Sequence, residues 1–281
     1  MSDKKFGVCG SGTMGVGIAY AAASAGYDVV LYDLNEEILS RASETIDSFV
    51  EKGVERGKLS QEEGEKIREG ISTATDLGEM EGASVVVEAI IERLDIKQEL
   101  FRKLEEVLDE SAIIATNTSS IAVTEMANGL HHPERVVGMH FFNPAHIMKL
   151  VEVIKGYATS EEVMNRTVEL SKELGKVPVR VKDTPGFIVN RVARNFYGEA
   201  FRIVGEGAAS HDQVDRCLKS TGFKMGPFEL MDLIGIDVNF MVTQSVYGQY
   251  FNEARFQPHL IQKKMVESGR IGKKGGGGFY S

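Results

Sequence analysis

The feature that most constrains the fold is a glycine-rich turn near the start of the chain, Gly10-x-Gly12-x-x-Gly15. A short apolar run precedes it, and an apolar run over residues 16–25 follows it. A strand, a glycine turn and a helix in this order match the fingerprint of dinucleotide-binding domains. Gly10 permits a sharp turn, Gly12 leaves room for a pyrophosphate, and Gly15 lets the helix pack against the strand. The phosphates would lie at the helix N-terminus, where free N–H groups favour negative charge.

A second strand is predicted over residues 27–32, and Asp33 stands at its end. Asp33 lies 18 positions after Gly15, close to the spacing of about 20 at which such domains place the acid that binds the ribose hydroxyls. Its carboxylate would repel a 2′-phosphate, and no arginine follows it over residues 34–36, so we expect NAD rather than NADP as the cofactor. The alternative is that Asp33 is a loop carboxylate or a helix cap.

Length and charge narrow the class of protein. With 281 residues, 42% of them hydrophobic, the chain can form one large domain or two of moderate size. A net charge of −9 and the lack of a long basic run argue against a nucleic-acid partner. Cys9 and Cys217 fit no disulfide or metal-binding pattern, so we expect no metal and a reducing compartment. The predicted first strand begins at residue 6 and no apolar run reaches about 18 residues, so we expect a cytoplasmic protein with no targeting peptide and no membrane contact.

Residues 35–70 are rich in charge, and their apolar residues recur at helical spacing. They predict a helical hairpin inserted after the second strand, with its second helix over residues 61–69. Lys52, Arg56 and Lys58 lie near the tip of this hairpin. Taken alone, these three cations are simplest to interpret as a solvated helix face.

The sheet is predicted to continue through six further strands, over residues 74–77, 83–89, 113–116, 135–144, 149–154 and 177–181. Polar residues follow two of them. Glu92 and Lys97 come after one strand, at the edge where open α/β sheets bind ligands, although a surface ion pair is the alternative. Residues 117–120 follow another strand as Asn-Thr-Ser-Ser, and capping the helix near Val123 would need only one of them.

Glu152 is enclosed by apolar residues in its strand, a costly place for a charge unless it is paired. His140, in the preceding strand, is the nearest sensible partner. A histidine beside a carboxylate is a proton-transfer pair, because the carboxylate orients the ring and stabilises the imidazolium. A histidine that only packs in the core is the alternative, and the enclosed Glu152 argues against it.

The strand patterns stop at residues 183–186, where the sequence Asp-Thr-Pro-Gly breaks the chain. Asn190 lies just beyond this break, where a cleft would form. We therefore predict an α/β fold, a Rossmann-like doubly wound parallel sheet with a helical hairpin insertion over residues 1–183, followed by an all-α domain over residues 184–281. Helices are expected over residues 187–206, 212–218, 226–234 and 238–251, followed by a glycine- and lysine-rich tail over residues 269–281.

Six segments together resemble the short-chain L-3-hydroxyacyl-CoA dehydrogenases, above all the bacterial 3-hydroxybutyryl-CoA dehydrogenases among them. They occur in the family's order along nearly the whole chain and cover residues 10–15, 117–120, 140–144, 148–153, 183–191 and 225–230. The runs HFFNP, MKLVEV and DTPGFIVNR within them are highly specific. The resemblance implies an NAD-dependent enzyme that interconverts (S)-3-hydroxybutyryl-CoA and acetoacetyl-CoA.

The resemblance also implies roles for individual residues. The residues that match the catalytic and substrate-orienting positions are His140, Glu152, Ser119 and Asn190. The residues that match NAD contacts are Gly10, Gly12, Thr13, Met14, Gly15, Asp33, Glu92, Lys97 and Asn117. The residues that match coenzyme A contacts are Ser119, Lys52 and Arg56. The family's helical domain forms a homodimer interface, so a homodimer is expected.

Two segments depart from the family pattern. Residues 144–147 read Pro-Ala-His-Ile instead of a more usual Pro-x-Pro-Val, which makes His146 unexpected, and the tail carries extra glycines. Two alternatives remain open. A sister dehydrogenase acting on a free hydroxy or sugar acid would share the fold but would not need Lys52 and Arg56. A non-catalytic NAD-binding structural or sensor protein would not need His140, Glu152, Ser119 and Asn190 together.

Overall fold

The computed structural model describes residues 4–280. The chain divides into two compact units, one ending at Thr184 and the other beginning at Pro185. The first unit contains all the strands of the sheet, and the described part of the second is helical apart from turns, loops and one isolated β-bridge between Gly272 and Gly277. The predicted fold class is confirmed.

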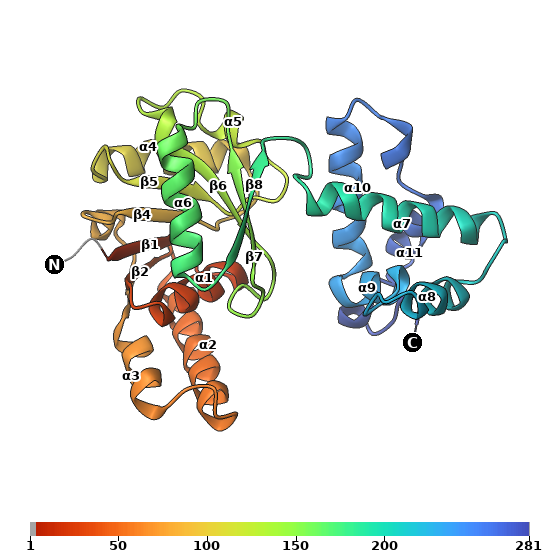
Figure 1. Cartoon of the computed structure of the whole chain (residues 1–281), viewed down its shortest axis with the longest axis horizontal. Coiled ribbons are helices and arrows are strands. Elements are labelled where there is room, and N and C mark those ends of the chain that lie inside the picture. Colours follow the sequence, from red (N-terminus) through yellow and green to blue (C-terminus); the bar gives the residue numbers. More distant parts are fainter. Residues whose placement is uncertain (1–3, 281) are drawn as a thin grey trace. The chain divides into compact units, whose positions relative to one another are not determined.

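The first unit is built on one eight-stranded sheet with the strand order β3-β2-β1-β4-β5-β6-β7-β8 (Figure 1). Its strands are β1 (Lys5–Cys9), β2 (Asp28–Tyr32), β3 (Ile71–Ala74), β4 (Val85–Glu88), β5 (Ile113–Thr116), β6 (Val136–Phe141), β7 (Leu150–Lys155) and β8 (Val177–Lys182). Neighbouring strands run parallel except β6 and β7, which are antiparallel. The strand order reverses at β1, which pairs with β2 on one side and β4 on the other. Open α/β sheets bind ligands beside the carboxyl ends of strands at such a point.

Six α-helices belong to this unit as described, α1 (Thr13–Ser24), α2 (Glu36–Glu55), α3 (Gln61–Glu69), α4 (Leu94–Val107), α5 (Val123–Met126) and α6 (Glu161–Glu173). The helices α2 and α3 form the predicted hairpin and lie side by side, extending away from the sheet (Figure 1). The side chain of Asn35 caps the start of α2, and a capping box between Ser60 and Glu63 begins α3.

The prediction of a strand over residues 74–77 was wrong in position. The strand is β3, which ends at Ala74, and a 3₁₀ turn, η1 (Leu77–Met80), follows it. The Asp76 side chain accepts the Gly78 N–H and so begins that turn. A polar residue that caps a turn competes with strand pairing, and the apolar Leu77 alone did not signal this.

Alternate residues of the strands point to one face of the sheet and form a single core with α1, α2 and α6. On the central strands β1 and β4 these residues are Phe6, Val8, Val85 and Val87. Because both faces of the central strands are covered, β4 and β5 are buried along their whole length. The sheet is therefore a firm base for the loops at its carboxyl edge.

The second unit contains α7 (Val189–Gly205), α8 (His211–Ser220), α9 (Pro227–Ile234), α10 (Ile236–Gln249) and α11 (Leu260–Glu267). The sequence did not predict α11. The glycine-rich tail is held within this unit, because the buried Asp232 accepts the N–H groups of Phe279 and Tyr280. Across residues 4–280, no helix has the length and apolar character needed to cross a membrane.

Candidate functional site

The glycine turn between β1 and α1 has the geometry that the motif predicts, but its glycines serve different purposes. Gly10 has φ +100°, and a Cβ there would lie 2.6 Å from the carbonyl oxygen of Ala89. A Cβ on Gly15 would lie 1.7 Å from the carbonyl oxygen of Gly10. At Gly12, by contrast, no described atom lies within 4 Å of the Cβ position. The protein itself therefore requires Gly10 and Gly15, whereas Gly12 keeps open a space that a ligand can use.

The N-terminus of α1 is suited to an anion. Gly12 is its N-cap, no side chain of the described chain caps it, and its first turn carries no acidic residue. The first N–H groups of an α-helix have no partner within the helix, and together with the helix dipole they attract phosphate. The predicted contacts Thr13 and Met14 lie in this first turn.

Asp33 lies just after β2, and its Oδ2 accepts both the N–H and the hydroxyl of Ser11, each at 2.8 Å. The glycine turn thereby orients the carboxylate. Asp33 and Gly12 face a largely apolar cavity of about 520 Å³, which could enclose an adenosine group. Its other walls are formed by Gly10, Tyr32, Leu34, Ile38, Ala89, Ile90, Ile91, Ile96, Glu99, Leu100 and Lys103. The sequence analysis did not single out Ser11, because a motif defined by the spacing of its glycines does not distinguish Ser11 from other loop residues.

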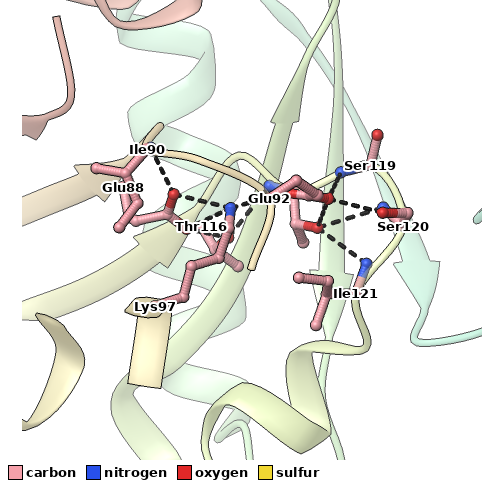
Figure 2. Close-up of polar contacts among 9 residues, drawn as sticks. Glu88, Ile90, Glu92, Lys97, Thr116, Ser119, Ser120 and Ile121 are labelled. Carbon is pink, nitrogen blue, oxygen red and sulfur yellow. Dashed lines mark hydrogen bonds and ion pairs between the residues drawn. The ribbon is translucent and has the colours of Figure 1, made fainter. Parts of the chain in front are cut away.

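An ion cluster that is buried at Glu88 and Lys97 and exposed at Glu92 supports the loops after β4 and β5 (Figure 2). The ammonium of Lys97 lies 2.8 and 3.0 Å from the two carboxylate oxygens of Glu88 and 2.8 Å from Glu92. The side chains of Lys97 and Glu88 are 1% and 0% exposed. The surface ion pair considered above is therefore wrong for Lys97. Lys97 is thus held between two carboxylates, and only Glu92 of the two has an exposed side chain.

The two carboxyl groups of this cluster differ in acidity. Burial raises the pKa of Glu88, although Lys97 favours its ionised form. Burial also acts to raise the pKa of Glu92, but the charge of Lys97 and hydrogen bonds from Lys97, Thr118 and Ser120 outweigh it and hold that pKa below its ordinary value. Glu92 thus reaches the sheet edge as a carboxylate that accepts hydrogen bonds.

The residues of the Asn-Thr-Ser-Ser segment after β5 make different contacts. The Thr118 hydroxyl donates to Glu92, a contact that the sequence analysis did not assign. The amide oxygen of Asn117 accepts the Phe141 N–H at 2.8 Å and so ties β5 to β6. The Ser119 N–H donates to Glu92 at 3.3 Å, while Figure 2 shows its hydroxyl pointing away from that carboxylate. Ser119 therefore offers its hydroxyl elsewhere.

His140 and Glu152 are direct cross-strand neighbours in the antiparallel pair of β6 and β7. The Nδ1 atom of His140 lies 2.8 Å from Oε2 of Glu152, and both side chains are buried. Because β6 runs parallel to β1, β4 and β5, His140 lies near the same edge of the sheet as the glycine turn. The structure thus brings together the two residues that the sequence paired.

The loop between β6 and β7 is held by Lys176, a buried residue that directly precedes β8. The ammonium of Lys176 donates to the carbonyl oxygens of Ala145 and Met148 at 2.6 and 3.1 Å. Ala145 is buried, whereas Asn143 and Pro144 are exposed and joined by a cis peptide bond. The sequence offered no sign of Lys176, because its partners are backbone groups.

The remaining predicted residues are spread over both units. Lys52, in the last turn of α2, and Arg56, its C-cap, are exposed at the hairpin tip. Asn190 lies in the first turn of α7 in the helical unit, where its carbonyl oxygen accepts the Arg194 Nε–H at 3.2 Å.

Comparison with known proteins gives a consistent result. Residues 5–184 match the model of the 3-hydroxyacyl-CoA dehydrogenase NAD binding domain, and residues 186–281 match that of the 3-hydroxyacyl-CoA dehydrogenase C-terminal domain. The chain is 49% identical to the 3-hydroxyadipyl-CoA dehydrogenase of Escherichia coli over 97% of its own length, but spans only 58% of that protein.

Two solved structures are similar over the whole chain. A 3-hydroxybutyryl-CoA dehydrogenase from Escherichia coli superposes with a TM-score of 0.98 at 48% identity, and the match covers 100% of this chain and 60% of that one. The (S)-3-hydroxybutyryl-CoA dehydrogenase of Ralstonia eutropha superposes with a TM-score of 0.95 at 35% identity, and the match covers 99% of each chain. With its NAD-binding unit and its helical unit both matched, this chain belongs to the 3-hydroxyacyl-CoA dehydrogenase family.

Proposed function

We propose that this chain is an NAD-dependent dehydrogenase that interconverts (S)-3-hydroxybutyryl-CoA and acetoacetyl-CoA. The observation that carries the proposal is the buried contact of 2.8 Å between His140 and Glu152 at the edge of an NAD-binding domain. The full-length similarity to the Ralstonia eutropha enzyme supports the same substrate.

The cofactor would supply the hydride chemistry, and the chain supplies position and proton transfer. Because a carboxylate can only accept, Nδ1 of His140 would carry the hydrogen in its 2.8 Å contact with Glu152, which leaves the lone pair on Nε2. During oxidation, Nε2 takes the proton of the substrate's 3-hydroxyl. The imidazolium that forms is then stabilised by the carboxylate beside it, and in reduction the proton returns along the same path.

The other site residues bind and orient. Asp33 would bind the ribose hydroxyls and select NAD, and the free N–H groups of α1 would bind the pyrophosphate. Ser119 and Asn190 would hydrogen-bond the reacting oxygens of the substrate and the nicotinamide side. Lys52 and Arg56, exposed at the hairpin tip, would bind the coenzyme A phosphates.

The test measures the rate of acetoacetyl-CoA reduction with NADH and with NADPH, and the affinity for NADH. The purified protein should consume NADH rapidly with acetoacetyl-CoA and do so slowly with NADPH. His140→Gln should lower kcat by at least about a hundredfold, the usual scale of a general acid–base group, and leave NADH affinity nearly unchanged. Full activity in that variant would exclude the assignment of His140.

A second substrate has a specific observation in its favour, since the Escherichia coli relative with 49% identity is a 3-hydroxyadipyl-CoA dehydrogenase. That acyl chain is longer and ends in a free carboxylate. Assays of (S)-3-hydroxyadipyl-CoA beside (S)-3-hydroxybutyryl-CoA with NAD would decide between them through the ratio of the two kcat/KM values.

We also propose that the chain forms a homodimer through its helical unit. Large apolar side chains are exposed there, among them Val192, Met241 and Phe251. Large exposed apolar side chains favour association when a partner covers them. Sedimentation equilibrium should give twice the mass of one chain, and Met241→Glu should shift the protein toward the monomer.

A further inference from the structure

The loop of residues 142–149 joins the two strands that carry the proposed proton-transfer pair. It is anchored at Ala145, whose carbonyl oxygen accepts the Lys176 ammonium at 2.6 Å. Ala145 also packs tightly on α1, because a Cβ on Gly17 would lie 3.0 Å from the Cβ of Ala145. The residue that follows this anchor is His146, and its direction is therefore well defined.

His146 reaches from the loop to the helical hairpin. Its ring stacks on Phe49 of α2, with centroids 3.9 Å apart and ring planes 25° apart. Tyr20 of α1 packs edge-on against both rings, at 5.6 Å from His146 and 5.7 Å from Phe49. Burial lowers the pKa of His146, and the positive charge of Lys176 lowers it further. Both effects favour the neutral form of the ring in this stack. Three segments distant in the sequence are joined by this aromatic contact.

The same face of α2 continues from Phe49 to the hairpin tip. Lys52 and Arg56 follow Phe49 by three and seven positions, a spacing that places all three on one side of a helix. At a rise of about 1.5 Å per residue, they lie roughly 5 and 10 Å further along its axis. The stack therefore sets how far these cations lie from the loop that follows His140.

We propose that His146 is a positioning residue that sets the distance between the cations Lys52 and Arg56 of the hairpin and the His140–Glu152 pair. It thereby determines the preference for coenzyme A thioesters over short thioesters that lack the nucleotide. The inference rests on the proposed function. A coenzyme A thioester must reach both places at once, whereas a short thioester needs only the proton-transfer pair. Binding energy from the remote part of a substrate is realised only if the two sites are correctly spaced.

The test compares two substrates in three proteins. Acetoacetyl-CoA and acetoacetyl-N-acetylcysteamine, which lacks the nucleotide phosphates, are assayed with NADH in the wild type, in His146→Val and in His146→Phe. The valine variant removes the ring and should raise KM for acetoacetyl-CoA about three- to tenfold, the scale of one stacked aromatic pair, with kcat for the short thioester unchanged. The phenylalanine variant keeps a stacking ring and should stay within about twofold of wild type.

Two further variants complete the design. Phe49→Leu removes the same stack from the hairpin side and should produce the same shift in preference. His131→Val replaces an exposed histidine outside this cluster and should change neither KM. Unchanged NADH affinity in all variants shows that the NAD-binding unit remains intact.

The outcomes separate the two claims. A wild type that turns over acetoacetyl-CoA, with a preference that falls in His146→Val and Phe49→Leu and returns in His146→Phe, supports the inference. An unchanged preference, or an equal loss for both thioesters, overturns it while leaving the proposed function in place. A wild type that fails to consume NADH with either thioester overturns the proposed function and this inference with it.

Discussion

Replacing Lys97 with methionine should destabilise the sheet-containing unit by about 3 kcal/mol at neutral pH. The substitution keeps the approximate length of the side chain but removes the ammonium group. Glu88 is 0% exposed and receives four hydrogen bonds, two of them from Lys97 at 2.8 and 3.0 Å. Thr116 and the Ile90 N–H would remain as its donors.

The magnitude follows from the general cost of breaking a buried ion pair by removing one partner, about 3–5 kcal/mol. The lower end applies here for two reasons. Glu88 keeps half of its hydrogen bonds, and it can take up a proton instead of remaining an unpaired buried charge.

The second reason makes the cost depend on pH. Burial already raises the pKa of Glu88, and loss of Lys97 should raise it further. Between the ordinary glutamate pKa of about 4.3 and this higher value, the folded variant holds a proton that the unfolded chain has lost. Because the folded state binds more protons in this range, the variant gains stability as the pH falls. The cost of Lys97→Met should therefore be smaller at pH 5 than at pH 7. Between the pKa of Glu88 in the wild type and its higher pKa in the variant, the cost should fall by ~1 kcal/mol for each pH unit.

Native-state hydrogen exchange of the amides of β4 measures this cost for the sheet unit alone. Glu88→Gln combined with Lys97→Met removes both charges and should recover at least about 1 kcal/mol relative to the single variant. Lys103→Met, which removes an exposed ion pair with Glu99 on the same helix, is the control and should leave the exchange unchanged. Equal protection in Lys97→Met and the wild type, or a double variant less stable than the single one, would refute the reasoning.

Three other variants give sharp contrasts. Gly15→Ala would place its Cβ 1.7 Å from the Gly10 carbonyl oxygen, so it should cost roughly 1–3 kcal/mol in thermal unfolding. Gly12→Ala meets no described atom within 4 Å, so it should leave stability near that of the wild type yet weaken NADH binding in calorimetry; unchanged affinity would show that no phosphate approaches Gly12. Glu152→Gln should lower kcat by at least about tenfold, because a neutral amide replaces a charge-assisted hydrogen bond to the imidazolium, and a wild-type kcat would contradict the pairing.

Much of the sheet unit could be predicted because its signals are local. The glycine turn, the buried β-branched run of β4 and the charged hairpin each reveal themselves within a few residues. Glu152 could be paired with His140 because a carboxylate inside an apolar strand demands a partner. The prediction of the helical unit was less complete, because α11 was missed. This helix is short and its one buried residue is Gln262, so its apolar periodicity is weak.

The supporting contacts could not be predicted, for a physical reason. Lys97 stood out only as a possible surface partner of Glu92, and its buried contact with Glu88 forms only when the loop after β4 folds. Thr118 stood out only as one of four polar residues after β5, and its contact with Glu92 needs both loops in place. Lys176 binds backbone carbonyls, which every residue carries. His146 stood out only as a departure from a family pattern, and its partner Phe49 lies 97 positions away.

The antiparallel pairing of β6 and β7 also has a consequence for how the site assembles during folding. His140 and Glu152 are joined by one loop, whereas the pairing of β1 with β4 brings Phe6 beside Val85. Closing a short loop costs less chain entropy than closing a long one, and hairpins form within about 1–10 μs. We therefore expect the strand pair that carries the proposed proton-transfer residues to form as a local event, while the edge of the sheet beside the glycine turn forms only with contacts between distant parts of the chain.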